Sequence, residues 1–266
     1  MKLEAAPTFR DMGGAIASED RRLRSGLLYR GGHLLDPSVE ELAYVRSLGL
    51  RQVFDLRSAS ERARQPSRWL DACTDTGDVP HEIHSDVNTD VRAGHDALLR
   101  LLEADCGVSG ARQMMLQTYR NFPGGFSEQL RPLFDALLDV RRMPVLVHCT
   151  AGKDRTGFAC AMVMHALGAD EETIFAEYLR TGDVLVNSPL AASLGEMLSH
   201  HLRRAMDPAT IAVIMGVEED FLGAAFDALH SNYGSIDAYL EQVAGMNAAR
   251  CEQLRARLLE AVAAPD

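Results

Sequence analysis

Short apolar runs mark the strands that this chain is expected to form. The run at 144–147 reads PVLV, and two shorter strand-like runs occupy 52–56 and 81–85. Compact runs of this length, rich in β-branched residues and bounded by turn residues, favour buried strands. The N-terminal part otherwise predicts loops and short strands, with turns at the glycine pairs 13–14 and 31–32.

Helical spacing of apolar residues dominates the rest of the chain. Asp36 and Pro37 supply an N-cap and a first-turn proline for a helix that Gly49 ends. The helical segments expected are 37–48, 58–64, 93–104, 111–121, 126–140, 155–167, 170–179, 191–205, 207–215, 218–233, 235–243 and 247–263. Strands followed by helices, with a helix-rich C-terminal half, predict an α/β fold with a central, mostly parallel sheet flanked by helices.

The composition is that of an ordinary globular chain. Of 266 residues, 47% are hydrophobic and 24% are charged, so we expect the chain to fold without stabilising cross-links. A formal net charge of −11 disfavours a nucleic-acid partner or an anionic membrane surface, because both reward a basic face. An anionic ligand must therefore be bound locally. No low-complexity linker or repeat divides the chain, so a single domain over 1–266 is expected.

Location and metal content follow from what the sequence lacks. It has no apolar run that could span a bilayer and no N-terminal apolar block before a cleavage site. We expect a soluble, cytoplasmic protein, with signal-independent export left open. An odd number of cysteines with no C-x-x-C pair predicts reduced thiols, and neither a metal site nor a cofactor is implied. The cysteines are Cys73, Cys106, Cys149, Cys160 and Cys251.

The stretch HCTAGKDRTG, from His148 to Gly157, carries the predicted chemistry. It lies where the strand at 144–147 meets the helix at 155–167. A loop of this size can surround a phosphate with backbone N–H groups, while the helix N-terminus adds partial positive charge. The residues expected to bind the phosphate are Thr150, Ala151, Gly152, Lys153, Thr156 and Gly157.

Two side chains of this loop have catalytic roles by their chemistry. Cys149 lies near a helix N-terminus and two cationic residues, so we expect a thiolate nucleophile. Arg155 offers a planar fork that can hold two phosphate oxygens. Thr156 could donate its hydroxyl to the Cys149 sulfur, or it could only satisfy the first turn of the helix. Cys160 on the same helix is expected to be a packed small residue.

The loop resembles the signature of protein tyrosine phosphatases, in which His-Cys, five residues, Arg, Thr or Ser, and Gly form a phosphate cradle. More narrowly, the chain is similar to the bacterial and fungal tyrosine phosphatase group. The agreeing stretches are FRDMGG at 9–14, LYRGGHL at 28–34, FDLRSASE at 54–61, EYLRTGDVL at 177–185 and YGSIDAYL at 233–240. This resemblance implies a tyrosine-phosphatase-like fold and a phosphocysteine intermediate on Cys149.

A general acid is also required, because a phenolate leaves poorly unless it is protonated. The Trp-Pro-Asp loop of many tyrosine phosphatases is missing, since Trp69 is followed by Leu70. The narrower resemblance implies Asp154, inside the cradle, as the acid. A cap or salt bridge is the alternative role for Asp154, and Asp86 and Asp11 are the rival acids.

The substrate expected first is phosphotyrosine in a protein or peptide. The pair Gly152-Lys153 resembles the cradle of phosphatases that accept inositol lipids, so phosphoinositides or phosphoserine/threonine form a second capacity. The alternative for Lys153 is a charge that keeps Cys149 ionised. The resemblance also suggests that helices within 183–215 cover the site as a lid, with ordinary helical packing as the alternative.

Two other functions compete with an active phosphatase. A non-catalytic phosphate-binding module would not need the set of Cys149, Asp154 and Arg155. A rhodanese-like sulfurtransferase also has a cysteine after a buried strand, but the Arg-Thr-Gly exit fits phosphatases better. Asp55 and Arg57 are expected to form a scaffold salt bridge rather than a catalytic pair.

Overall fold

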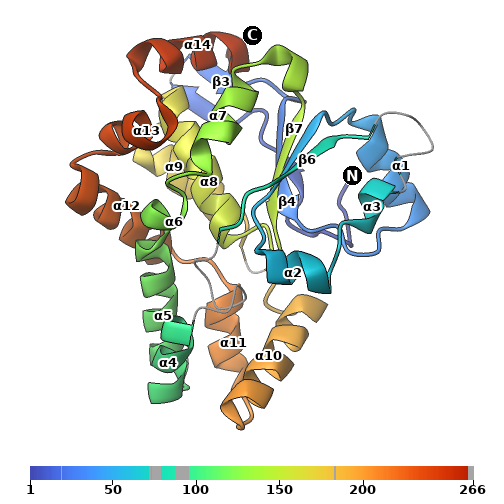
Figure 1. Ribbon diagram of the computed structural model, residues 1–266, viewed down its shortest axis with the longest axis vertical. Helices are drawn as coiled ribbons and strands as arrows, with labels where there is room; N and C mark the ends of the chain where they lie inside the picture. The colour runs from blue at the N-terminus through green and yellow to red at the C-terminus, as the bar shows by residue number, and fades with distance from the viewer. Residues whose placement is uncertain (19, 72, 74–78, 88–95, 183, 263–266) are drawn as a thin grey trace.

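The computed structural model describes residues 1–18, 20–71, 73, 79–87, 96–182 and 184–262 (Figure 1). Its main sheet has the strand order β1-β4-β7-β5-β6. The last four strands in this order are parallel, and β1 pairs with β4 in the antiparallel sense. The expected central, mostly parallel sheet is confirmed. The bounds are β1 Arg10–Asp11, β4 Leu28–Gly32, β5 Gln52–Asp55, β6 His81–His84 and β7 Val145–Cys149.

The strand β7 lies in the middle of this sheet because it is apolar on both faces. All five of its residues are buried, as expected for a parallel strand covered on both sides. Val145 and Val147 contribute to the large hydrophobic core, whereas Leu146 belongs to a smaller core. This alternation places the carboxyl end of β7, with Cys149, between two helical layers.

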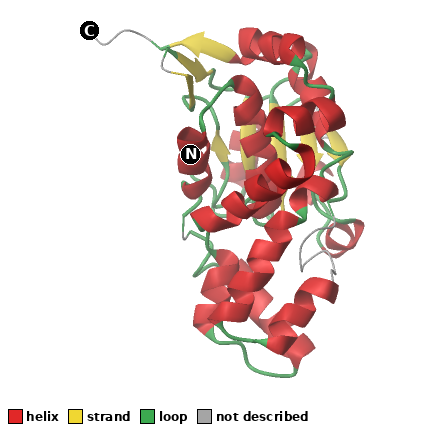
Figure 2. Ribbon diagram, turned by 90° about the vertical axis from the view of Figure 1, so that its left-hand side faces the viewer, coloured by secondary structure: helices red, strands yellow, loops and turns green. Residues whose placement is uncertain are grey.

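Helices cover both faces of the sheet and form a purely helical part at one end of the molecule (Figures 1 and 2). The helix α8, which follows β7, is the central one, since every residue except His165 is buried. The bounds are α1 Val39–Ser47, α2 Ala59–Arg64, α3 Arg68–Asp71, α4 Asp96–Ala104, α5 Val108–Arg120, α6 Phe122–Gly125, α7 Leu130–Leu137, η3 Val140–Arg142, α8 Asp154–Leu167, α9 Glu171–Leu179, α10 Pro189–Leu202, α11 Pro208–Met215, α12 Glu219–Tyr233, α13 Ile236–Ala244 and α14 Ala248–Leu258.

A second, three-stranded sheet joins the two ends of the chain. Its order is β2-β3-β8, with β2 at Ile16–Ser18, β3 at Arg21–Leu23 and β8 at Leu259–Ala261. The sequence predicted one helix over 247–263, and this was wrong for 259–262, whereas residue 263 lies outside the described residues. The helix ends at Leu258, and the following residues pair with β3, a long-range partner that local periodicity does not reveal.

Two further local predictions were wrong. The glycines at 31–32 lie inside β4 and not in a turn; there they let Phe9 and the loop after β7 approach the strand closely. The N-cap of α1 is Ser38, which forms a capping box with Glu41. That reciprocal pair satisfies more backbone N–H groups than Asp36 could.

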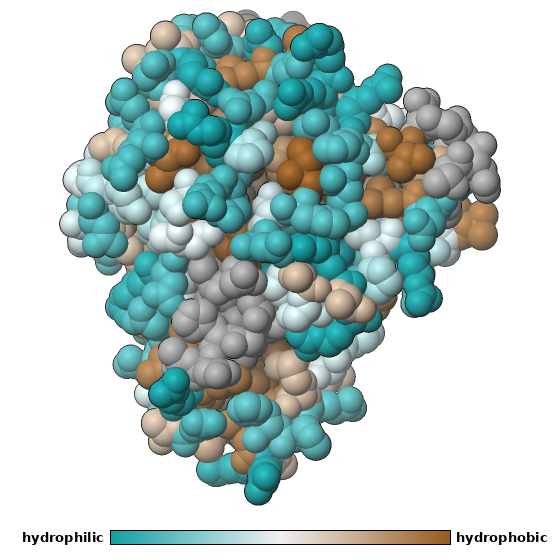
Figure 3. Space-filling view, viewed as in Figure 1, coloured by the Kyte–Doolittle hydropathy of each residue, from teal (hydrophilic) through white to brown (hydrophobic). Residues whose placement is uncertain are grey.

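The surface agrees with the composition. On the face seen in Figure 3, apolar residues are scattered in small patches among polar ones. Within the described residues, no helix has the length and apolarity required to cross a membrane. Of the expected helix over 93–104, the part before residue 96 lies outside the described residues, as does residue 183 of the expected lid.

Candidate active site

The connection between β7 and α8 brings the predicted residues together. Cys149 is the last residue of β7, and Asp154 and Arg155 are the first two residues of α8. Residues 150–153 therefore lead directly from the central strand to a helix N-terminus. Such a helix end carries unpaired N–H groups and partial positive charge, which together favour a bound anion.

Three successive carbonyl groups of this loop are held from outside. The bonds run from His33 N–H to the Thr150 carbonyl at 3.1 Å, from the Thr8 hydroxyl to the Ala151 carbonyl at 2.8 Å, and from the Arg30 guanidinium to the Gly152 carbonyl at 3.1 Å. In a trans peptide the N–H points away from the carbonyl oxygen. The amides that follow are thus turned to the other side, where Gly152 N–H donates to Cys149 Sγ at 3.2 Å.

Two glycines of the motif allow close packing against protein atoms. Gly152 has a φ of +69°, and a Cβ there would lie 2.2 Å from the backbone of Gly31 and Gly32. Gly157 lies in the helix, and its Cβ would stand 3.0 Å from the Tyr178 ring. The two glycines expected to bind the phosphate thus also allow close packing against β4 and α9.

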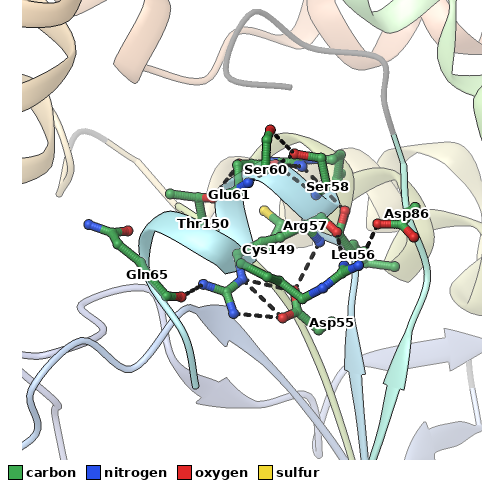
Figure 4. Close-up of polar contacts among 12 residues, drawn as sticks. Asp55, Leu56, Arg57, Ser58, Ser60, Glu61, Gln65, Asp86, Cys149 and Thr150 are labelled. Atoms are coloured by element: carbon green, nitrogen blue, oxygen red, sulfur yellow. Dashed lines mark hydrogen bonds and ion pairs between the residues drawn. The ribbon is translucent and has the colours of Figure 1, made fainter. Parts of the chain in front are cut away.

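Arg155 is completely buried and is paired with Glu61 of α2. Its two terminal nitrogens donate to the two carboxylate oxygens, each at 2.7 Å. Burial alone would raise the pKa of Glu61, but the hydrogen bonds and charge of Arg155 hold it well below its usual range. Glu61 also accepts the Thr150 hydroxyl and forms a capping box with Ser58. Through Glu61, the first turn of α2 therefore holds both Arg155 and Thr150, and Figure 4 shows Glu61 next to Thr150 and Cys149.

Asp154 is nearly buried, with 7% of its side chain exposed. Its Oδ1 accepts a hydrogen bond from the Tyr119 hydroxyl at 2.8 Å and lies 2.7 Å from Lys153 Nζ. The structure therefore places Asp154 at the end of the loop 150–153. It also gives Asp154 a salt bridge with Lys153, which is the alternative role that the sequence left open.

Lys153 joins the cradle to α11. Its ammonium donates to the carbonyl of Ile214 at 2.9 Å and to that of Gly216 at 2.8 Å. The carbonyl groups at a helix C-terminus carry partial negative charge, so a buried ammonium is a suitable cap. The segment 183–215, which was expected to be a lid, thus contacts the loop 150–153 through the Lys153 side chain.

The thiol itself lies deep in the site, since Cys149 is 2% exposed. The Thr156 hydroxyl is buried and has no hydrogen-bond partner among the described residues. Neither alternative considered for this hydroxyl, a bond to the Cys149 sulfur or a bond to the backbone of the first helical turn, is therefore seen. Cys160 is packed inside α8, where burial raises the pKa of its thiol and keeps it protonated.

The rival acids have other contacts. Asp86 follows β6, and its carboxylate, 46% exposed, pairs with Arg62 at 2.6 Å (Figure 4). Asp11 accepts the backbone N–H groups of Gly13 and Gly26, both at 2.8 Å, and so shapes a turn. Within the part of the chain that the structure describes, neither is bonded to residues 149–155.

One group of side chains has the atom types of a metal site. Asp55, Glu82 and His148 each bring one such atom within 4.8 Å of the others. However, Arg57 donates to both oxygens of Asp55, with the closest contact at 2.7 Å, so this carboxylate already has a cationic partner. The salt bridge expected between Asp55 and Arg57 is present.

Several residues around the cradle were missed by the sequence interpretation. Glu61 had a visible signal, because Ser58-Ala59-Ser60-Glu61 matches the capping-box pattern at the start of a helix. Arg30 and His33 lie in a stretch that was noted only for its resemblance. Tyr119 comes from α5, far from the motif in sequence, and no local pattern marks it.

A cysteine and an arginine at the two ends of one strand-to-helix loop, at the carboxyl end of the central parallel strand, are the arrangement of cysteine-dependent phosphatases. The tyrosine phosphatase family model matches residues 1–260. The chain is 32% identical to the triple specificity protein phosphatase PtpB of Mycobacterium tuberculosis, over 97% of this chain and 98% of that protein. It is 31% identical to a protein of Cupriavidus necator described as a tyrosine-protein phosphatase, over 94% and 85% of the two chains.

The chain therefore belongs to the tyrosine phosphatase family, as the motif predicted. The crystal structure of TpbA from P. aeruginosa aligns with 73% of this chain and 89% of its own, at 19% identity and a TM-score of 0.31. That likeness is too low to inform the site. Family membership sets the chain apart from the sulfurtransferases considered above.

Proposed function

We propose that the protein hydrolyses phosphotyrosine in proteins, with Cys149 as nucleophile, Arg155 as phosphate clamp and Asp154 as general acid. The observation that supports this most is the placement of all three around one loop whose carbonyl groups are held outward. The N–H groups, the helix end and the guanidinium then converge on the site of a phosphate bound next to the sulfur.

The reaction has two steps in this proposal. The Cys149 thiolate attacks phosphorus, the S–P bond forms, and the P–O bond to the phenol breaks while Asp154 gives its proton to the leaving oxygen. Water then attacks phosphorus, Asp154 takes one proton from that water, the S–P bond breaks, and inorganic phosphate is released. Arg155 holds the equatorial oxygens in both steps, and Glu61 keeps its fork oriented.

Phosphoserine/threonine and phosphoinositides form a second capacity. The relative in M. tuberculosis carries triple specificity in its name, and a rice protein named as an inositol diphosphatase is 39% identical over 51 residues. Lys153 would serve a second phosphate only after its ammonium leaves the α11 carbonyls. That exchange ties lipid-phosphate binding to movement of 183–215, the segment that we assign as a lid.

The test is hydrolysis of an aryl phosphate by wild type, Cys149→Ser and Asp154→Asn. We expect no turnover for Cys149→Ser, with orthophosphate binding retained. For Asp154→Asn we expect turnover to fall about 10²- to 10⁴-fold, the usual contribution of a general acid. Asp86→Asn is the matched control and should keep its activity. Equal rates for wild type and Cys149→Ser would end the proposed mechanism, and a large loss only in Asp86→Asn would move the acid to that residue.

A further inference from the structure

Tyr119 of α5 reaches the reacting groups from outside the phosphate loop. Its ring is completely buried, and its hydroxyl donates to Asp154 Oδ1 at 2.8 Å. The same hydroxyl lies 2.7 Å from the hydroxyl of Tyr178 on α9. The mechanism given above uses neither tyrosine.

The direction of the two hydrogen bonds follows from the chemistry of the groups. A carboxylate oxygen only accepts, so the single proton of Tyr119 points to Asp154. Tyr178 must then donate to the Tyr119 oxygen. Burial raises the pKa of both tyrosine hydroxyls, and the nearby Asp154 charge adds to the effect. Both hydroxyls therefore keep their protons and act as fixed donors.

The donors near Asp154 meet at one oxygen. The Tyr119 hydroxyl and the Lys153 ammonium both contact Oδ1, at 2.8 and 2.7 Å. An oxygen that already faces a hydroxyl proton and a cation is the poorer place for a further proton. The other oxygen, Oδ2, is therefore the one that carries the proton in the acid form. Since the two donors come from different elements, they also prevent the carboxyl group from turning over.

We propose that Tyr119 is a positioning residue for Asp154, which selects Oδ2 as the oxygen that delivers the proton to the leaving group. This inference rests on the proposed role of Asp154 as general acid. As the proton passes from Oδ2 to the leaving oxygen, negative charge develops on the carboxylate. The Tyr119 hydroxyl, which keeps its own proton, stabilises that charge on Oδ1 together with Lys153.

The experiment compares kcat/KM for two substrates in wild type and Tyr119→Phe. Phenyl phosphate has a poor leaving group that needs the proton, whereas 2,4-dinitrophenyl phosphate has a good one that does not. We expect kcat/KM for phenyl phosphate to fall about 10- to 100-fold, the range for a lost hydrogen bond to a charged group. For the dinitrophenyl ester we expect little change. Because both substrates are measured on one preparation, a smaller folded fraction lowers both rates equally and leaves their ratio unchanged.

Two other tyrosines provide controls. Tyr239 is also completely buried, and its hydroxyl donates to the Pro123 carbonyl at 2.9 Å, in a contact outside the cradle. Tyr239→Phe should leave the ratio of kcat/KM for phenyl phosphate to kcat/KM for the dinitrophenyl ester at the wild-type value. Tyr178→Phe removes only the second donor, so it should move the ratio in the same direction as Tyr119→Phe but less. It also serves as the test variant should Tyr119→Phe yield no folded protein.

The outcomes separate this inference from the proposed function. An unchanged ratio in Tyr119→Phe, or in Tyr178→Phe where that variant replaces it, would make Tyr119 a packing residue only. If Asp154→Asn lowers the ratio strongly while Tyr119→Phe does not, the acid assignment stands and the inference about Tyr119 is wrong. If Asp154→Asn leaves the ratio unchanged, Asp154 is not the acid and both statements fall.

Discussion

At the scale of single residues, Gly152 shows how closely the phosphate loop packs on the strand beside it. Its φ of +69° is a backbone region that costs other residues about 1–2 kcal/mol. A Cβ would in addition lie 2.2 Å from backbone atoms of Gly31 and Gly32, which no side-chain adjustment can relieve. For Gly152→Ala we therefore expect a larger loss of stability than the φ penalty, together with loss of phosphatase activity.

Gly14→Ala is the matched control for this prediction. Gly14 has a φ of +84°, but no atom lies within 4 Å of the position of its Cβ. It should lose only about 1–2 kcal/mol of unfolding free energy and keep its activity. Urea unfolding and aryl phosphate hydrolysis measure both quantities. Equal losses in the two variants, with activity retained, would show that contact with β4 does not shape the loop.

His33 makes the loop sensitive to acid. It is 4% exposed, its ring stacks on His148 at 5.9 Å between ring centroids, and its backbone N–H supports the Thr150 carbonyl. Burial, with Arg57 and His148 nearby, lowers the pKa of His33 to about 3. The unfolded chain, with a pKa near 6.5, takes up a proton that the folded chain rejects. Stability from this group is therefore present above about pH 6.5 and is lost as the pH falls toward 3.

We test this with His33→Phe, which keeps a flat ring that cannot titrate. Between pH 7 and pH 4.5, wild type should lose about 2–3 kcal/mol of unfolding free energy relative to this variant. The measurement is urea unfolding of both proteins across that range. Parallel stability curves for the two proteins would contradict a buried neutral His33.

At the scale of elements, α2 couples a helix cap to Arg155, the proposed phosphate clamp. Glu61 is the capping-box partner of Ser58 and also the bidentate partner of Arg155. Glutamine can keep the capping box but not the ion pair. For Glu61→Gln we expect a loss of roughly 3 kcal/mol, because a buried Arg155 charge loses its partner. We also expect kcat/KM to fall more than about tenfold, since the guanidinium is no longer fixed.

Ser58→Ala tests the helix cap without the ion pair. It removes the cap but leaves the ion pair, so the expected cost is about 1 kcal/mol of stability with kcat/KM little changed. Urea unfolding and steady-state kinetics on both variants provide the comparison. If Ser58→Ala lowers kcat/KM as much as Glu61→Gln does, the helix rather than the ion pair positions Arg155.

Elements also show how far the sequence could predict this protein. The strand at 144–147, the helix from 155 and the loop between them were predictable, because apolar runs and helical spacing are local signals. The supports of that loop come from β4, α2 and α5 through contacts that no local pattern encodes. The end of the helix over 247–263 was mistaken for the same reason, since pairing with β3 outweighs local helical propensity.

At the scale of the whole molecule, the small sheet lies at the end of the fold near α14, whereas the carboxyl end of β7 points the other way, toward the helical part with α10 and α11 (Figure 1). Leu259 of β8 pairs with Leu23 of β3, and both side chains are buried. This contact ties the C-terminal helices to the N-terminal part of the chain. The cradle depends on contacts from β4, α2 and α5, so loss of packing in the small sheet should weaken the fold without changing the site.

Leu259→Ala tests this separation. Truncating a buried leucine costs about 2–5 kcal/mol, so we expect unfolding at a lower urea concentration than for wild type. At temperatures where the variant is folded, its kcat/KM should equal that of wild type. Glu260 lies in the same strand, but its side chain is 41% exposed and paired with Arg22 at the surface. Glu260→Ala should change the free energy of unfolding by no more than about 0.5 kcal/mol and leave kcat/KM unchanged. A fall in kcat/KM for folded Leu259→Ala would mean that the small sheet acts on the cradle through α8, the helix that begins at the cradle and packs against α14.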